Sequence, residues 1–284
     1  MNNRIDLHLH STCSDGCFTP AEVVRHAASL GLGVIGLTDH DSVSGVAEAQ
    51  ELGTDLGVEV VPGCEFSAQV DGRDVHLLGY HIDCDSPALL ACLKTYQGAR
   101  RDRAEQIVRK LNALGVKLRI EHVLAKSDGA AIGRPHVADA LVEEGFVFSA
   151  DEAFRKFLGY GRPAYAEKYM MTPAEAIGVI HQGGGLASLA HPGLYRRDSI
   201  VPGLVEAGLD AIEVRHIKHG PGEVHRYSEM VERYGLLATG GSDCHGDGRG
   251  PAVMGTVDVP RSYADRLLEA LASRTTVAGD IESV

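Results

Sequence analysis

The sequence contains no tryptophan, no Cys-x-x-Cys pair and no long apolar run. A transmembrane helix needs about 20 apolar residues, and no stretch of the chain approaches that length. The segment from Met1 to Asp6 also lacks the apolar core of a signal peptide. We therefore expect a cytoplasmic protein with no membrane partner, in which the six cysteines are reduced thiols and form neither disulfides nor a zinc site.

Positive charge is also scarce. The chain has 27 lysines and arginines against 39 aspartates and glutamates, which gives a formal net charge of −12. Long nucleic acids bind to basic surfaces, so this balance argues against them as partners. A small anion needs only a few local cations or metal ions and stays compatible with the charge. With 284 residues, 44% of them hydrophobic, the chain is long enough to bury a large core.

The first and last thirds of the chain alternate between strand and helix patterns. Two Thr-Pro-Ala-Glu capping boxes, at residues 19–22 and 172–175, each predict a helix start. The predicted strands are Arg4 to His10, Val34 to Thr38, Glu59 to Val61, Val75 to Tyr80, Leu186 to Leu189, Ala211 to Val214 and Leu236 to Thr239. Other helices are predicted at Val43 to Leu56 and Ser262 to Ser273. Such alternation predicts a mostly parallel α/β sheet, either closed into a barrel or open.

The middle of the chain lacks this alternation. One or two long helices are predicted from Pro87 to Leu114, and short helices follow at Ile120 to Ala125, Val137 to Glu144 and Asp151 to Leu158. No convincing strand pattern occurs between Ser86 and Arg162. We therefore expect a helical insertion, in which the charged block from Arg100 to Arg103 forms a solvated helix face.

Histidine and carboxylate side chains lie on or after nearly every predicted strand. His8 and His10 alternate on the first strand and therefore project to the same side. The others, in chain order, are Asp15, His40, Glu65, His76, His191, Asp243 and His245. Because barrel enzymes carry their chemistry at the carboxyl ends of the strands, this repetition favours a functional site over coincidence.

These donor types predict a cluster of divalent metal ions. Imidazoles mixed with carboxylate oxygens suit Mn²⁺, Zn²⁺ or Fe²⁺, and without thiolate ligands there is no preference for soft metals. The nine candidate ligands exceed the four of a single tetrahedral zinc ion. Two or three ions are therefore expected.

Together, the motifs resemble the PHP (polymerase and histidinol phosphatase) family of the amidohydrolase superfamily. The matching segments are Asp6-Leu7-His8-Leu9-His10-Ser11, Ser14-Asp15-Gly16, Thr38-Asp39-His40-Asp41, Gly63-Cys64-Glu65, His76, Ala190-His191-Pro192 and Ser242-Asp243-Cys244-His245. The resemblance implies a distorted (β/α)₇ TIM-like barrel. In this interpretation residues 1–98 and 165–284 form the barrel, and residues 99–164 form a helical insertion or lid.

The resemblance also implies an assignment of the metal ligands. The first ion would be held by His8, His10, Glu65 and Asp243. Glu65 would bridge to a second ion, held also by His76 and His191, and a third would be held by Asp15, His40 and His245. Many members of the family have histidine where Asp15 stands, which leaves occupancy of the third position open. Mn²⁺ is the expected metal, with Zn²⁺ and Fe²⁺ as alternatives, and the expected catalytic residues are Asp243, His191 and Glu65.

Residues that bind the substrate are expected outside the metal motifs. Arg134 and His136 lie in a Gly-Arg-Pro-His segment at a predicted helix start. Lys168 lies where the chain returns to the barrel, and Arg215 follows the strand Ala211 to Val214. This arrangement is similar to the family's 3′,5′-nucleotide bisphosphate phosphatases, which remove the 3′-phosphate from compounds such as 3′-phosphoadenosine 5′-phosphate. The resemblance implies that the four residues bind the phosphates of such a small nucleotide.

Three alternatives stay open at this point. The first is a 5′-3′ exonuclease acting on short RNA or DNA oligomers, which the acidic charge does not exclude. The second is a phosphatase of the histidinol-phosphate type. The third is a non-catalytic, metal-bound scaffold, although the complete ligand set argues against a degenerate site.

Overall fold

The computed structural model describes residues 3–127, 131–167, 171–246 and 253–281, without the side chains beyond residue 274. A seven-stranded sheet forms its centre, with the strands in the order of the sequence. The strands are β1 (Arg4–Leu9), β2 (Leu32–Leu37), β3 (Glu59–Val70), β4 (Arg73–Tyr80), β5 (Leu186–Leu189), β6 (Ala211–His216) and β7 (Leu237–Gly241). Leu9 pairs with Cys244, just after β7, so the two ends of the sheet meet and nearly close a barrel. The predicted distorted barrel is confirmed.

Strand β3 is longer than the sequence pattern indicates. The prediction ends it at Val61, but β3 continues through Pro62 and Gly63 to Val70 and pairs antiparallel with β4. Pro62 is the last residue of β3 that pairs with β2. Its missing N–H is tolerated there because the hydrogen bonds between the two strands end at this residue. Asp71 and Gly72 both have positive φ, 50° and 73°, and form a tight hairpin turn. This Asp-Gly pair was the signal for the hairpin.

Helices cover the outside of the sheet. They are α1 (Pro20–Ser29), α2 (Val46–Leu56), α7 (Pro173–Gln182), α8 (Pro192–Tyr195), α9 (Val201–Glu206), α10 (Pro221–Tyr234) and α11 (Arg261–Ile281), with a 3₁₀ turn η2 (Asp198–Ile200). Both predicted capping boxes are present, at the starts of α1 and α7. Among the residues described, no helix is both long enough and apolar enough to cross a bilayer.

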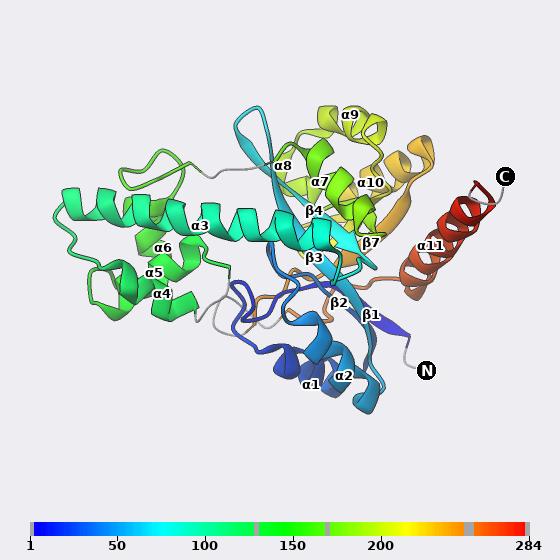
Figure 1. Ribbon diagram of the computed structural model, residues 1–284, viewed down its shortest axis with the longest axis horizontal. Coiled ribbons are helices and arrows are strands. Elements are labelled where there is room, and N and C mark those ends of the chain that lie inside the picture. The colour runs from blue at the N-terminus through cyan, green and yellow to red at the C-terminus, as the bar shows by residue number, and fades with distance from the viewer. Residues whose placement is uncertain (1–2, 128–130, 168–170, 247–252, 282–284) are drawn as a thin grey trace.

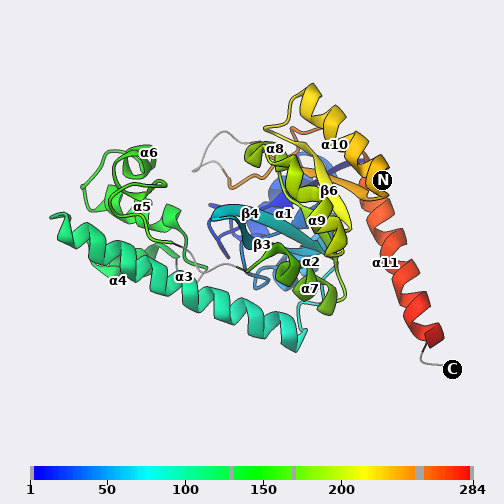
Figure 2. The ribbon, with the colours of Figure 1, turned by 90° about the horizontal axis from the view of Figure 1, so that it is seen from above.

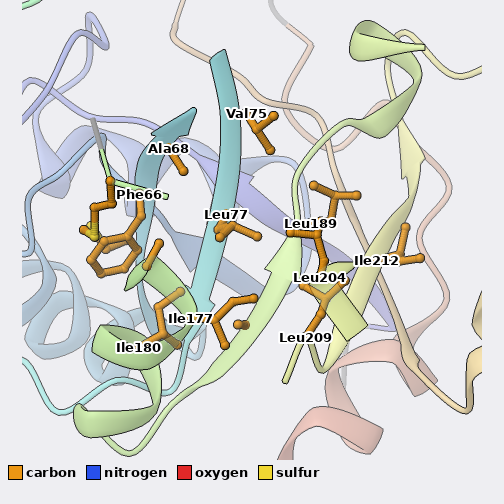
Figure 3. Packing of buried hydrophobic residues seen from close by; sticks show 14 of the residues in the cluster. Phe66, Ala68, Val75, Leu77, Ile177, Ile180, Leu189, Leu204, Leu209 and Ile212 are labelled. Carbon is orange, nitrogen blue, oxygen red and sulfur yellow. The ribbon is translucent and has the colours of Figure 1, made fainter. Parts of the chain in front are cut away.

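The largest part of the core lies between the sheet and its helices. Phe66 and Leu77, on β3 and β4, pack with Ile177 and Ile180 of α7 (Figure 3). The residues Leu189 and Ile212 of the next two strands continue the same buried cluster, as do Leu204 and Leu209 at and after α9. Packing on the outer face fixes the strands, and therefore fixes the positions at which their ends present polar side chains.

The insertion is helical, as predicted, and extends away from the barrel on the side opposite α11 (Figures 1 and 2). It consists of the outer part of α3 (Pro87–Ala113), then α4 (Ile120–Ser127), α5 (Arg134–Glu143), α6 (Ala150–Ala153) and a π-helical turn η1 (Phe154–Leu158). Leu89 and Leu93 of α3 belong to the barrel core, whereas Ile107 and Leu111 belong to a separate core within the insertion. One continuous helix therefore connects the two cores.

The prediction of a solvated face for Arg100 to Arg103 is wrong for two of its residues. The side chains of Arg100 and Arg103 are buried, each with only 8% of its surface exposed. They lie on α3 between its two apolar segments. Their guanidinium groups point inward, to the Asp41 carboxylate and to the main-chain oxygen of Ala166, respectively. A charge pattern along one helix did not reveal these partners because both lie far away in the sequence.

Candidate metal centre

The nine predicted metal ligands converge at one end of the barrel. Their donor atoms form three overlapping groups, within each of which all donor atoms lie within 4.8 Å of one another. The groups are His8, His10, Glu65 and Asp243; His40, Glu65 and His76; and His10, Asp15, His40 and His245. His191 joins them through its Nε2 atom, which lies 2.9 Å from Glu65 Oε1. We refer to these nine residues as the metal cluster.

Glu65 lies at the centre of the metal cluster. Its Oε2 atom lies 3.4 Å from His8 Nε2, 3.3 Å from His10 Nε2 and 3.0 Å from His40 Nδ1. Its Oε1 atom instead faces His76 Nδ1 at 2.8 Å and His191 Nε2 at 2.9 Å. The two oxygens thus face different sets of imidazoles, which is the geometry of a carboxylate that bridges two ions.

The loops after the strands supply the remaining ligands. Asp243 Oδ1 lies 3.4 Å from His8 Nε2 and 3.1 Å from His10 Nε2, and Asp15 Oδ1 lies 3.3 Å from His245 Nε2. Two of the predicted ligands, His191 and Asp243, have positive φ, 29° and 55°. Such backbone strain in residues other than glycine is concentrated at functional sites, where the surrounding structure holds it in place.

The charges in the cluster suit a divalent cation. Burial alone would raise the pKa of Glu65, but His76, His8 and a hydrogen bond from His10 hold it well below its usual range, so this carboxylate is ionised. Burial lowers the pKa of His40 to about 3, which leaves its imidazole neutral and able to act as a ligand. At His10, burial lowers the pKa, but Asp243 and Glu65 outweigh it and raise the pKa to about 10, so a metal ion that binds there must displace a proton.

Unsatisfied polar atoms point to the same conclusion. The buried atoms His8 Nε2, His40 Nδ1, His76 Nδ1 and Glu65 Oε2 have no hydrogen-bond partner among the described residues. Buried polar atoms almost always have partners, and each exception requires an explanation. A bound divalent ion would satisfy these atoms together, so the residues present fit a metal site.

Metal binding should stabilise the folded protein. In the chain freed of metal by a chelator, addition of Mn²⁺ at about 100 times its Kd is expected to add about 2.7 kcal/mol of stability. The reason is that the cluster is assembled only in the folded state. A calorimetric melt with and without Mn²⁺ measures this as a rise in Tm, with Ca²⁺ as a control ion that prefers all-oxygen ligands. An unchanged Tm at saturating Mn²⁺ would contradict the metal assignment.

Glu213, which was not among the predicted site residues, forms hydrogen bonds with two residues of the metal cluster. Its Oε1 atom shares a 3.0 Å hydrogen bond with His8 Nδ1, and its Oε2 atom accepts the backbone N–H of His191 at 2.6 Å. Glu213 is fully buried on β6. The available signal was an acidic residue within the apolar run Ala211 to Val214. A carboxylate on the far nitrogen of a ligand imidazole fixes its tautomer and orientation.

Replacement of this carboxylate should weaken metal binding. Glu213→Gln is expected to lower metal affinity about 10- to 100-fold, because the amide no longer fixes the donor nitrogen of His8. Titration with Mn²⁺, followed by calorimetry, measures the change. Glu229→Gln on the exposed face of α10 is the matched control and should leave affinity unchanged. Equal affinities for the two variants would show that Glu213 only fills space.

A cavity of about 170 Å³ opens beside the cluster. Asp15, His40 and His76 line its metal side, and three arginines line the side formed by the insertion. We refer to it as the arginine cavity, with the residues Asp15, His40, Ser67, Asp74, His76, Arg100, Arg103, Gly133, Arg134, Pro135 and Phe154. The insertion therefore brings positive charge to the edge of the metal cluster.

The three arginines are engaged to different degrees. The charge of Arg100 is balanced by Asp41, and its remaining nitrogens donate to Ser67 Oγ and the oxygen of Ile132. In Arg103, Nε donates to the oxygen of Ala166, but the buried Nη2 has no partner among the described residues. Burial and the nearby charge of Arg134 lower the pKa of Arg103 to about 10, so it stays charged at neutral pH.

Of the predicted phosphate-binding residues, Arg134 lies in the arginine cavity and Arg215 does not. Arg134 is the first residue of α5, where its side chain packs on the rings of Phe154 and Tyr165. His136 is buried behind it, and its Nδ1 accepts the N–H of Gly133 at 3.0 Å, which fixes the start of α5. Lys168 lies outside the described residues.

The structure does not place Arg215 beside the metal cluster, where the phosphate-binding prediction requires it. Its guanidinium donates to the main-chain oxygen of Asp258 at 2.9 Å, away from the cluster. A register irregularity between Glu213 and Arg215 inserts one residue into β6. Strict alternation would turn Arg215 to the same side as Glu213, but the inserted residue turns His216 there instead. His216 Nε2 lies 3.5 Å from Asp243 Oδ2, so the structure brings this histidine to the cluster.

Comparison with known proteins finds several phosphoesterases among the relatives of this chain. Residues 6–146 match the PHP domain family. The chain is 36% identical over 263 residues to a 3′,5′-nucleoside bisphosphate phosphatase of Chromobacterium violaceum, covering 90% of this chain and 92% of that protein. It is 33% identical to the 5′-3′ exoribonuclease Rnm of Escherichia coli K12, covering 84% of each. It is also 37% identical to a phosphoribosyl 1,2-cyclic phosphate 1,2-diphosphodiesterase of Eggerthella lenta, covering 87% of this chain and 97% of that protein.

A solved structure extends the likeness to the whole fold. A Bifidobacterium adolescentis protein proposed to be a metal-dependent phosphoesterase superposes with a TM-score of 0.85 at 30% identity. The match covers 93% of this chain and 95% of that one, so it includes both the barrel and the insertion. Sequence identity at this level over nearly the full length, together with the ligand motifs, leads to one conclusion. The chain belongs to the PHP family.

Proposed function

We propose that this protein removes the 3′-phosphate from nucleoside 3′,5′-bisphosphates, such as 3′-phosphoadenosine 5′-phosphate, and leaves the 5′-monophosphate. By family, the chain is a hydrolase of phosphoesters. The observation that carries the finer proposal is the arginine cavity beside the metal cluster. A substrate with two phosphates needs one site for the phosphate that is cleaved and a cationic site nearby for the other, and these two features match that need.

The residues of the cluster would hold two or three divalent ions, for which Mn²⁺ is our proposal. Bound ions supply Lewis acidity to the phosphoryl oxygens and lower the pKa of a coordinated water. The ligands of the first ion would be His8, His10, Glu65 and Asp243, and Glu65 would also reach the second with His76 and His191. Asp15, His40 and His245 would complete the site. We propose Asp243, His191 and Glu65 as the catalytic residues, because these side chains would hold the ions that act on the phosphate.

The reaction balances as a hydrolysis. Water adds to phosphorus, the bond from phosphorus to the 3′-oxygen breaks, and that oxygen takes up a proton. The products are the nucleoside 5′-monophosphate and inorganic phosphate. Buried arginines such as Arg103 interact more strongly with a charged substrate than exposed ones do, because water screens them less.

The second phosphate is assigned to Arg103 and Arg134. The Nη2 atom of Arg103 is a buried donor without a partner among the described residues, and Arg134 lies at the mouth of the same cavity. Arginine offers paired N–H donors that match phosphate oxygens. Arg100 is already neutralised by Asp41, so its role is to hold α3 in position.

Substrate comparison tests the proposal. With Mn²⁺ present, phosphate release should be fast from 3′-phosphoadenosine 5′-phosphate and slow from histidinol phosphate. Turnover of a short 5′-phosphorylated RNA ahead of the bisphosphate would favour an exoribonuclease. Turnover of a ribose 1,2-cyclic phosphate alone would favour a cyclic phosphodiesterase. Either result would overturn the 3′-phosphatase assignment and keep the metal chemistry.

The phosphate site has its own test. Arg134→Ala is expected to lower kcat/KM for 3′-phosphoadenosine 5′-phosphate about 10- to 150-fold, the range for loss of one hydrogen bond to a charged group. Hydrolysis of adenosine 3′-monophosphate, which lacks the second phosphate, should change little. Arg101→Ala is the control, because Arg101 is exposed on α3 and pairs with Glu105 on the same helix. Equal losses on both substrates would remove Arg134 from the second phosphate.

A further inference from the structure

A second cavity adjoins the arginine cavity. Its volume is about 410 Å³, and it is lined by Gly72, Arg73, Asp74, Arg134, Tyr160 and Tyr165. Arg134 and Asp74 line both cavities, so a ligand that spans them passes these two residues. The volume lies within the range of small-molecule sites. No metal ligand lines it, so the metal chemistry does not account for it. We refer to it as the aromatic cavity.

Two tyrosines form one wall of the aromatic cavity. The rings of Tyr160 and Tyr165 meet edge to face, with centroids 5.3 Å apart and an angle of 66°. Tyr165 is held by the guanidinium groups of Arg103 and Arg134, which lie 5.7 and 5.8 Å from its centroid. Tyr165 therefore connects the phosphate-binding arginines to the aromatic wall.

Tyr160, unlike Tyr165, is largely exposed to solvent. Its side chain lies in a loop of the insertion and is 80% exposed, whereas Tyr80 and Tyr227 are fully buried. A large exposed aromatic residue that lines a cavity is typical of a ligand site, because its apolar ring face stays in water until a ligand covers it. A flat aromatic ligand would cover that face by stacking.

Other residues that line the aromatic cavity are polar. Arg73 and Asp74 lie at the start of β4, directly after the hairpin turn. The Asp74 carboxylate accepts N–H donors. A ring with N–H groups on its edge can donate to Asp74 while its flat apolar face covers Tyr160. Among the parts of a nucleotide, this description applies to the base.

We propose that the aromatic cavity binds the nucleobase, stacked on Tyr160, while the phosphates occupy the arginine cavity and the metal cluster. The proposal rests on the proposed function for its nucleotide ligand. It adds that the enzyme recognises its substrate through the base as well as through the phosphates. The hairpin of β3 and β4 and the loop after η1 are then the elements that set base preference.

Comparison with a substrate that lacks the base provides the first test. The substrates are 3′-phosphoadenosine 5′-phosphate and the corresponding abasic sugar 3,5-bisphosphate. Tyr160→Ala should lower kcat/KM for the adenine substrate about 5- to 150-fold, the range for loss of one stacking contact. Tyr160→Phe keeps the ring and should keep the rate. On the abasic substrate, the wild-type protein and both variants should be equally slow.

A binding measurement makes the test independent of turnover. The ligand is 2-aminopurine riboside 5′-monophosphate, whose base fluoresces and which carries no 3′-phosphate to be cleaved. Because the chain has no tryptophan, protein emission interferes little. Stacking should quench the fluorescence in the wild-type protein and in Tyr160→Phe, with affinity weakened by the same factor in Tyr160→Ala.

The outcomes separate the two proposals. If all three proteins bind the fluorescent nucleotide equally, or if adenine and abasic substrates react equally, the base site is wrong and the 3′-phosphatase assignment stands. If binding depends on Tyr160 but neither bisphosphate is hydrolysed, the base site stands and the proposed reaction is wrong.

Discussion

Glu65→Gln is expected to lower kcat/KM for phosphate release by about 1,000-fold, the largest effect we expect from one substitution. Both oxygens of Glu65 face imidazoles of the cluster, at 2.8 to 3.4 Å. The amide keeps the volume but loses the negative charge and one acceptor. Loss of an ion, and with it several kcal/mol of transition-state stabilisation, corresponds to about three powers of ten. Phosphate release measured over a range of Mn²⁺ concentrations gives the effect.

A control and a metal measurement make this result specific. Glu51→Gln, at an exposed position on α2, changes the same atoms outside the site and should keep full activity. The metal content of purified Glu65→Gln should fall, whereas a variant that merely loses an acid or base would keep its ions. Normal metal content with normal activity would refute the bridging role of Glu65.

The second large effect concerns stability. Asp41→Ala is expected to destabilise the fold by about 3–5 kcal/mol, the usual cost when one partner of a buried ion pair is removed. Asp41 is fully buried, and its Oδ2 atom lies 2.5 Å from Arg100 Nη2. It also accepts the N–H of Ser67, and its own N–H donates to the oxygen of Glu65. The pair therefore links α3 to the loop after β2, and this loop is hydrogen-bonded to the main chain of Glu65 on β3. Urea unfolding measures the loss.

Three further variants separate charge from backbone strain. Asp41 has a φ of 48°, a backbone conformation that is strained for alanine but tolerated by asparagine. Asp41→Asn therefore removes the charge without adding backbone strain. The asparagine variant should show most of the loss. Asp41→Ala combined with Arg100→Met should recover part of it, because the unpaired charge is gone. Asp55→Ala, exposed on α2, should stay within about 0.5 kcal/mol of the wild type. Simple additivity in the double variant would argue against a coupled pair.

The convergence of the nine predicted ligands could be expected from the sequence because each position depends on local features. A His-x-His pair on a strand projects to one side by the geometry of any strand. His191 and Asp243 come directly after short buried strands, and parallel strands bring their carboxyl ends together. The two capping boxes also involve only neighbouring residues, and both helices begin where predicted.

The features that sequence patterns missed depend on contacts across the chain. Arg100 resembles a surface residue within its helix, and only the packing of α3 against the barrel places it beside Asp41. Glu213 pairs with His8 across 205 residues. A one-residue irregularity in β6 turns His216, and not Arg215, toward the metal cluster. A register shift of one residue has no clear sequence signature in a short strand.

The sequence by itself determined the family and the alternating fold class, and it predicted nine side chains that lie together in the structure, because periodicity, caps and strand-end motifs are properties of short segments. The tertiary structure alone decided which charged residues turn inward. It placed the arginines of the insertion beside the metal cluster, and it placed Tyr160 and Tyr165 next to Arg134. The reason is physical: burial, ion pairing and cavity shape depend on what packs opposite a residue, and those partners come from distant parts of the chain.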